Sequence, residues 1–200
     1  VSRLDPGRDR DAAKAAFGVG EGRWLVLVFG GSLGALRLNQ AVADAAPRWA
    51  HRADLAVHHV VGRRDWPSTT VPAHLGDLQL RQVEYEDDMP GALAAADLAV
   101  CRAGSSTCFE LAAAGLPSIL VPSPYVTADQ QTGNARHLVD AGAARLVPDA
   151  ELDGERLVAE VDGLLADPAA LAAMGAAARG WARPEAAHDI AALAREHARA

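Results

Sequence analysis

The sequence is poor in aromatic residues, in cysteine and in long apolar runs, and each shortage narrows the class of protein. Aromatic residues make up 4% of the 200 residues, which disfavours an aromatic-rich β-sandwich. The two cysteines, Cys101 and Cys108, are too few for a disulfide scaffold and are not spaced like a metal site, so we expect buried or half-buried thiols. No apolar run approaches the length of a membrane span, and we therefore expect a soluble chain.

The chain also lacks an excess of positive charge. Its formal net charge is −7, which argues against a broad nucleic-acid surface, so we expect no nucleic-acid partner. Half of the residues are hydrophobic, with many Ala, Leu and Val. This composition is typical of helices packed on a buried sheet.

Short apolar runs alternate with amphipathic stretches along the whole chain. The runs lack polar alternation, as strands covered on both faces do. We predict a single α/β domain over residues 1–200, with a doubly wound parallel sheet of Rossmann-like type. Residues 1–22 are interpreted as a linker and a short helix. The predicted strands are 24–29, 55–60, 78–83, 98–101, 118–121 and 145–147, and the predicted helices are 35–46, 90–95, 106–114, 130–141, 153–165, 169–178 and 184–198.

Ligands of such sheets bind outside the carboxyl ends of the strands, which directs attention to four loops. The first, FGGSLGALRLN, has three glycines, and the N–H groups that open the next helix would face an anion there. The loop matches neither the G-x-G-x-x-G dinucleotide fingerprint nor a P-loop. Phosphate binding and a plain glycine-rich turn both stay open.

The second loop, EYEDDMPGAL, is acidic. Glu86, Asp87 and Asp88 could suggest a divalent-metal site for a sugar nucleotide. The alternative is that Asp87 or Asp88 caps a helix whose first turn takes Pro90. We favour the cap.

The third loop, CRAGSSTCFELAAAG, presents small side chains, so backbone amides at the start of a helix can approach a ligand. A diphosphate fits these amides and the helix dipole. Glu110, one turn further on, could accept hydrogen bonds from two ribose hydroxyls. Alternatively, Thr107-x-x-Glu110 is a capping box that serves only the helix.

The fourth loop, PSPYVTADQQTGN, ends in two adjacent amides, Gln130 and Gln131, whose donors and acceptors suit sugar hydroxyls. Thr127-x-x-Gln130 is a second possible capping box. The neighbouring His137 is interpreted as a surface or packing residue. The pair His58 and His59, on a predicted strand, has no matching metal ligands in the sequence and is interpreted as structural.

Together these loops resemble the C-terminal, donor-binding half of MurG-like GT-B glycosyltransferases. The resemblance covers nearly the whole chain: GGSLGALRLN, YEDDM, ADLAVCRAGSSTCFELAAAGLPSILVP, DQQTGNARHLVDAGAA and ARPEAAHDIAAL. It implies the C-terminal half of a GT-B fold and the transfer of GlcNAc from UDP-GlcNAc to lipid I in peptidoglycan synthesis. It also implies a full-length protein in the cytoplasm, peripheral at the inner face of the membrane.

The resemblance assigns roles to particular residues. It implies that UDP-GlcNAc is the donor substrate, with no metal and no further cofactor. Glu110 would bind the ribose hydroxyls, and the backbone of Glu86 would recognise uracil. The diphosphate would be held by the amides around Gly104, Ser105, Ser106 and Thr107, with Ser32 and Gly34 of the first loop facing the phosphates; Gln130 and Gln131 would contact the GlcNAc hydroxyls, and Asn134 would support their helix.

The chain departs from the family pattern in three respects. Leu33 stands where the family usually has Gln, and Glu86 stands where an apolar residue is usual. The family's N-terminal domain, which carries the acceptor site and the proposed catalytic histidine, is missing. We therefore assign no catalytic residue and expect the chain to bind the donor but to be silent without its other half.

Other functions stay open at this point. The chain could be the donor-binding subunit of a two-component transferase, or belong to a transferase of secondary metabolism. An NAD-type oxidoreductase is disfavoured by the missing fingerprint, and a sugar-nucleotide epimerase by the lack of a suitable set of acids and histidines.

Overall fold

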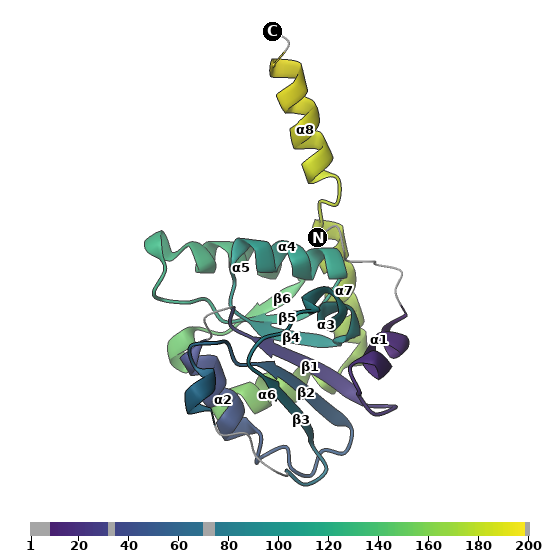
Figure 1. Cartoon of the computed structure of the whole chain (residues 1–200), viewed down its shortest axis with the longest axis vertical. Helices are drawn as coiled ribbons and strands as arrows, with labels where there is room; N and C mark the ends of the chain where they lie inside the picture. Colours follow the sequence, from purple (N-terminus) through teal and green to yellow (C-terminus); the bar gives the residue numbers. More distant parts are fainter. Residues whose placement is uncertain (1–8, 32–34, 70–74, 199–200) are drawn as a thin grey trace.

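The apolar runs form the six strands of one parallel sheet with helices on both faces (Figure 1). The computed structural model describes residues 9–31, 35–69 and 75–198. The strands are β1 (Trp24–Phe29), β2 (Leu55–Val60), β3 (Gln79–Val83), β4 (Leu98–Cys101), β5 (Ser118–Leu120) and β6 (Ala144–Leu146). They lie in the order β3-β2-β1-β4-β5-β6, and every neighbouring pair is parallel. The predicted doubly wound parallel sheet is confirmed.

The helices match the sequence prediction closely, with small shifts at their ends. The helix predicted at 169–178 is longer than expected, and the strand predicted at 78–83 begins one residue later. The α-helices are α1 (Arg10–Ala16), α2 (Leu36–Ala45), α3 (Met89–Ala95), α4 (Ser105–Ala114), α5 (Gln130–Asp140), α6 (Gly154–Leu165), α7 (Pro168–Trp181) and α8 (Ala186–His197); the short 3₁₀ helices are η1 (Trp66–Ser68), η2 (Thr127–Asp129) and η3 (Asp149–Glu151).

Alternate residues of the central strand serve two separate cores. Val26 and Val28 of β1 pack with α2 and α6 on one face, whereas Leu27 and Phe29 pack with α3, α4 and α5 on the other. Successive side chains of a strand point to opposite faces, so a strand between two helical layers must be apolar throughout. This is why LVLVF shows no polar alternation.

Helix α7 joins the two cores beside the amino ends of the strands. Its Leu171 belongs to the core with α2 and α6, and its Ala178 to the core with α4 and α5. The crossing requires a close approach: a Cβ added at Gly175 would lie 2.9 Å from the carbonyl oxygen of Gly115, which ends α4 in a left-handed conformation with φ +62°. A larger residue at Gly175 would push the two helices apart.

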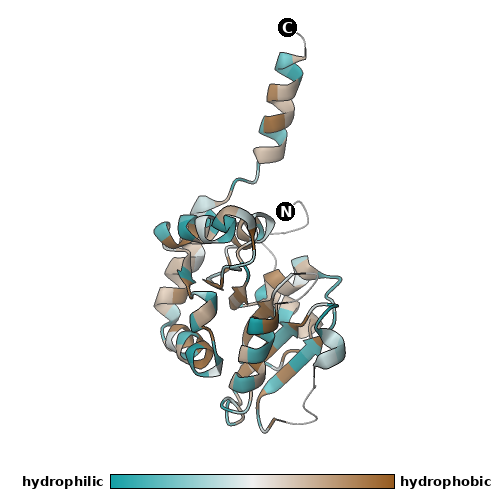
Figure 2. Cartoon of the chain, turned by 90° about the vertical axis from the view of Figure 1, so that its left-hand side faces the viewer, coloured by the Kyte–Doolittle hydropathy of each residue, from teal (hydrophilic) through white to brown (hydrophobic). Residues whose placement is uncertain are grey.

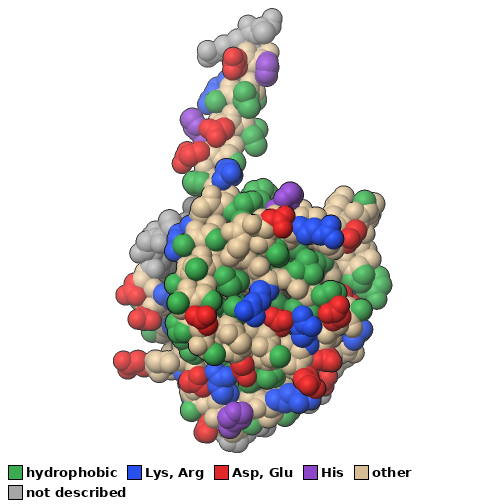
Figure 3. Space-filling model, turned by 180° about the vertical axis from the view of Figure 1, so that it is seen from behind, with side chains coloured by type: hydrophobic (Ala, Val, Ile, Leu, Met, Phe, Trp, Pro, Cys, Tyr) green, Lys and Arg blue, Asp and Glu red, His purple; other side chains and the backbone are tan. Residues whose placement is uncertain are grey.

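Helix α8, predicted at 184–198, stands away from the rest of the molecule, and none of its residues is buried (Figures 1 and 2). It carries exposed Ile190 and Leu193 beside charged residues. On the face seen in Figure 3, acidic and basic side chains are interspersed over the body. Within the described ranges, no helix combines the length and the apolar character needed to cross a bilayer.

Candidate functional site

The loops that follow β1, β3, β4 and β5 meet at one edge of the molecule, because all the strands are parallel and their carboxyl ends point the same way. The strand order reverses between β1 and β4. Ligands of open α/β sheets bind at this reversal. The site is therefore built outward from the loop after β4.

The N-terminus of α4 lies at this reversal and is open. Gly104 is its N-cap, with φ −62° and ψ 149°, and among the described residues no side chain accepts a hydrogen bond from the first amides of the helix. Ser105 and Ser106 are exposed, and a Cβ added at Gly104 would meet only the Thr107 hydroxyl at 3.6 Å. The first amides of a helix have no intrahelical partner and carry the positive end of its dipole, so this end can receive an anion.

The alternative that Thr107-x-x-Glu110 is a capping box is wrong. The helix begins at Ser105, so Thr107 is its third residue and cannot be the N-cap. The extended backbone of Gly104 takes that position instead. Glu110 is half-buried one turn further on, and within the described part of the chain its carboxylate forms no ion pair or hydrogen bond. It is left available to a ligand.

Two side chains of α5 brace the loop between β4 and α4. The Gln131 Oε1 atom accepts hydrogen bonds from the backbone N–H groups of Ala103 (3.2 Å) and Ser123 (2.8 Å). Asn134 donates its Nδ2–H to the Ala103 carbonyl at 3.0 Å. The sequence interpretation gave Asn134 a supporting role, and the structure shows that it supports the loop as well as lying on the helix. The Gln131 carbonyl is engaged, so only its Nε2 amino group is left to meet a sugar, while Gln130 is exposed.

The second possible capping box, Thr127-x-x-Gln130, is also wrong. Ala128 and Asp129 take left-handed conformations with φ 53° and 50°, so residues 127–129 form a separate 3₁₀ turn. The N-cap of α5 is Asp129, which makes no side-chain cap bond to the helix. Like α4, helix α5 begins without a side-chain cap.

Arg102 is a part of the site that sequence reasoning missed. Its side chain is almost buried, pairs with Asp149 and donates to the carbonyls of Val121 and Pro122. It thereby joins the loops after β4, β5 and β6, next to a cavity of about 540 Å³ that Gln131 and Tyr125 also line. A charged residue directly after a buried apolar strand was the signal that could have found it.

The loop after β3 is held from inside the molecule. The Asp88 carboxylate accepts from the N–H of Gly91 at 3.0 Å, which confirms the predicted cap, and Pro90 lies in the first turn of α3. The Glu86 carboxylate accepts from the Asp88 N–H and lies 2.9 Å from Nε2 of His58. The side chain of Glu86 thus points into the protein, and its backbone stays at the carboxyl edge.

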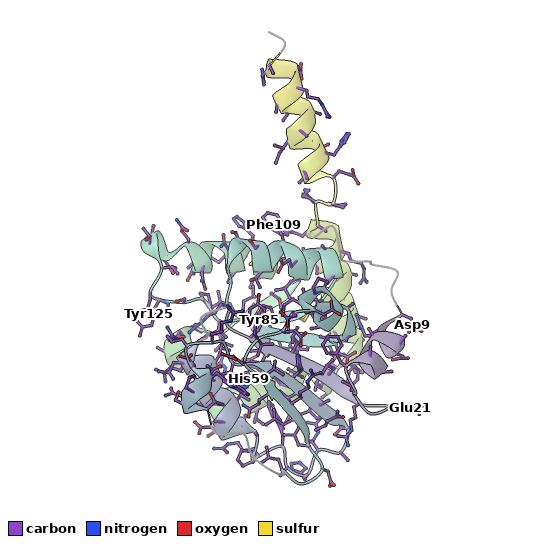
Figure 4. The ribbon with its side chains drawn as sticks, viewed as in Figure 1. Asp9, Glu21, His59, Tyr85, Phe109 and Tyr125 are labelled. Carbon is purple, nitrogen blue, oxygen red and sulfur yellow. The ribbon has the colours of Figure 1, made fainter. Side chains whose placement is uncertain are left out.

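The adjacent histidines of β2 are both buried, on opposite faces of the sheet. His59 Nε2 lies 2.9 Å from the Asn39 carbonyl oxygen, and its Nδ1 lies 3.0 Å from Gln82 Nε2. Burial lowers the pKa of His59 to about 4, with a smaller effect from His58. The neutral ring is therefore a structural connection between α2 and β3. In Figure 4 it lies well inside the outline of the molecule, whereas Tyr125 lies at the rim.

The two cysteines are free and buried, as predicted. Burial raises the pKa of Cys108 to about 11 and that of Cys101 well above its usual value. Both therefore behave as apolar side chains.

Ser32 and Gly34, predicted to face the phosphates, lie outside the described residues. Over the described ranges, no group of three or more His, Cys, Asp or Glu residues is placed to hold a metal ion.

Comparisons with known proteins agree with this arrangement. A family model described as the glycosyltransferase family 28 C-terminal domain matches residues 25–192. The UDP-N-acetylglucosamine--N-acetylmuramyl-(pentapeptide) pyrophosphoryl-undecaprenol N-acetylglucosamine transferase of Salinibacter ruber is 46% identical over 183 residues, which cover 92% of this chain and 49% of the relative. The protein of the same name from Mycolicibacterium smegmatis is 43% identical over 203 residues, which cover 100% of this chain and 51% of the relative.

A solved structure shows the same similarity. The crystal structure of Acinetobacter baumannii MurG matches with a TM-score of 0.77 and 28% identity, over 97% of this chain and 55% of that chain. The chain spans about half the length of the curated relatives that it matches.

Proposed function

The chain belongs to the family of glycosyltransferase family 28 C-terminal domains, and from this premise we propose that it binds UDP-GlcNAc as the donor half of a MurG-like transferase. One observation carries the proposal: the amides of α4, uncapped by any described side chain, open at the reversal of the sheet, and the Glu110 carboxylate one turn away has no partner in the described part of the chain. A diphosphate fits the amides, and two ribose hydroxyls fit the carboxylate.

The same geometry supplies one half of the chemistry of glycosyl transfer. When the sugar leaves its diphosphate, negative charge develops on the diphosphate oxygens. Preorganised amides and a helix N-terminus stabilise such charge without reorganisation. The acceptor hydroxyl and the base that takes its proton would come from the other half of the protein.

We propose that the whole protein transfers GlcNAc to a lipid-linked acceptor in peptidoglycan synthesis. Two relatives at 43% and 46% identity are named for an undecaprenol-linked acceptor. Such a lipid places the reaction at a membrane surface, so we propose a peripheral protein at the inner face of the membrane. The independence from metal stays a prediction: donor binding should be equal in EDTA and in Mg²⁺.

The test of donor binding is calorimetric titration of the chain with UDP and UDP-GlcNAc. Both should bind, and Glu110→Ala should weaken both about 30-fold, because a charge-assisted hydrogen-bond pair to the ribose is worth about 2 kcal/mol. Glu155→Ala, which removes an exposed carboxylate from α6, is the matched control and should bind like the wild type. If the wild type does not bind UDP, the proposal is overturned.

A further inference from the structure

The side chain of Glu86 is unusual for a carboxylate in a surface loop, because most of it is shielded from solvent. Its side chain is 10% exposed and faces the ring of His58, which is 4% exposed. The Oε1 atom accepts from the Asp88 N–H at 2.9 Å, and Oε2 lies 2.9 Å from His58 Nε2. Both oxygens of the carboxylate are therefore engaged from inside the loop.

The surroundings of the His58 ring favour this contact with Glu86. It extends from β2 on the face covered by α1 and α3, where the Phe17 ring meets it edge-on at 5.6 Å. Burial lowers the pKa of His58, Arg81 lowers it further, and Glu86 opposes both effects. The neutral ring uses its Nε2–H to donate to Glu86, while its buried Nδ1 has no partner in the described part of the chain. The Glu86 contact is the ring's one polar connection there.

The loop is also held on its other side. Tyr85, next to Glu86 and exposed, lies under the guanidinium of Arg63, 4.5 Å from the ring centroid. Figure 4 places Tyr85 near the middle of the molecule, over the sheet. Between these two contacts, the backbone N–H and C=O of Glu86 form no hydrogen bond to any described residue. This donor and this acceptor are therefore left for a ligand that reaches the loop.

We propose that the His58–Glu86 pair is a positioning device for nucleobase recognition: by drawing the Glu86 side chain inward, His58 turns the Glu86 backbone toward the base of the bound nucleotide. This inference rests on the proposed function, in which the nucleotide is UDP. Uracil has an acceptor oxygen beside an N–H donor, which is complementary to a backbone N–H and C=O. Cytosine has the reverse pattern at the same edge.

The contact with His58 also prevents the Glu86 carboxylate from repelling the ligand. An outward-facing Glu86 carboxylate would place a negative charge close to a ligand that already carries a charged diphosphate. A single substitution that removes His58 leaves a buried carboxylate without its partner, which drives the side chain out to water. The replacement of both partners by apolar residues removes that driving force.

The test compares UDP with CDP, which differ only at the edge of the base. The wild type should prefer UDP, and His58→Phe should reduce the ratio of the two affinities about tenfold or more. Glu86→Ala, which removes the anchor from the loop and loses no core packing, should reduce the ratio similarly. In the double variant His58→Phe/Glu86→Leu, the ratio should recover, because an apolar pair keeps the side chain inside. Thermal unfolding of each variant shows that it is folded.

Glu110→Ala is the matched control, since the ribose is common to both ligands: it should weaken UDP and CDP alike and leave their ratio unchanged. A merely structural role of His58 would give the same uniform loss. An unchanged ratio in His58→Phe and Glu86→Ala, or a double variant no better than His58→Phe, overturns the inference while UDP binding by the wild type still stands. If the wild type binds no UDP, the proposed function fails and the inference falls with it.

Discussion

The helices of this protein begin in two different ways. In α1, α3, α6 and α7, an aspartate closes the N-terminus by accepting a hydrogen bond from the first turn, through Asp9, Asp88, Asp153 and Asp167. In α2, α4 and α5, which follow β1, β4 and β5, no side chain of the described residues closes the N-terminus, and the same is true of the detached helix α8. A capping side chain typically contributes about 1 kcal/mol. The fold forgoes this contribution after the neighbouring strands β1, β4 and β5, where a ligand is expected to meet the same amides, but keeps it in α3, which follows the outer strand β3.

The largest expected effect comes from closing the open end of α4. Gly104 already has the extended backbone of an N-cap and room for a side chain, so in Gly104→Asp the carboxylate should occupy the amides. UDP binding should weaken about 1000-fold, equivalent to about 4 kcal/mol, because the amides are lost and a negative charge is added. The free energy of unfolding should stay equal or rise by a few tenths of a kcal/mol. Calorimetry and urea unfolding measure the two quantities.

Gly104→Ala is the control for this substitution, since it adds a Cβ but no capping group. It should bind UDP nearly as well as the wild type. If Gly104→Asp binds UDP with wild-type affinity, the open end is not the diphosphate site.

The next largest effect is a pH dependence of stability, caused by the buried ring of His59. Its pKa is about 4 in the folded protein, against about 6.5 when unfolded. Below pH 6.5 the His59 ring takes up a proton in the unfolded chain but stays neutral in the folded protein. The free energy of unfolding therefore falls as the pH drops from 6.5 to about 4. The loss should total about 3 kcal/mol. It is absent above pH 6.5, where the ring is neutral in both states.

His59→Gln isolates this contribution, because the other titrating groups remain in both proteins. Urea unfolding at a series of pH values should show a steeper fall for the wild type than for His59→Gln between pH 6.5 and 4. Parallel curves for the two proteins would contradict a neutral buried His59.

A smaller effect on UDP binding is expected from removing Asn134, which supports the loop before the uncapped N-terminus of α4. Asn134→Ala removes the hydrogen bond to the Ala103 carbonyl and frees the loop before α4. UDP binding should weaken about tenfold, or about 1.4 kcal/mol, with a stability loss of about 1 kcal/mol. Thr132→Ala on the same helix loses only an exposed contact to Asp129 and should change neither quantity. Equal UDP affinity of Asn134→Ala and the wild type would show that the brace is dispensable.

The smallest effect on UDP binding should come from the helix N-termini that are capped by aspartates. Asp153→Ala and Asp167→Ala each remove a capping bond, of 2.8 and 3.0 Å, and should each lower the free energy of unfolding by about 1 kcal/mol. UDP affinity should not change in either. If either variant lost UDP affinity without losing stability, the conclusion that the capped helix starts serve stability and not binding would be contradicted.

The sheet could be read from the sequence because each strand between two helical layers must be apolar throughout, and runs such as LVLVF are. The start of α4 was predicted to within one residue, but the alternative of a Thr107-x-x-Glu110 capping box was wrong, because that pattern is local whereas the backbone of Gly104 decides where the helix begins. The inward turn of Glu86 was also missed. It depends on His58, 28 residues away, and no local pattern contains such a pairing.

The crossing of α7 has a consequence for the synthesis of the protein. The strands and helices of both cores precede α7 in the chain, but α7 is the element that packs against both. A nascent chain can therefore assemble its sheet before the helix that packs against both cores has been synthesised. Parallel pairing over long sequence separations is slow and exposes apolar surface while it proceeds. A ribosome that stalls before Pro168 would therefore release a chain whose two cores lack the helix that joins them, and such a chain would be prone to aggregation.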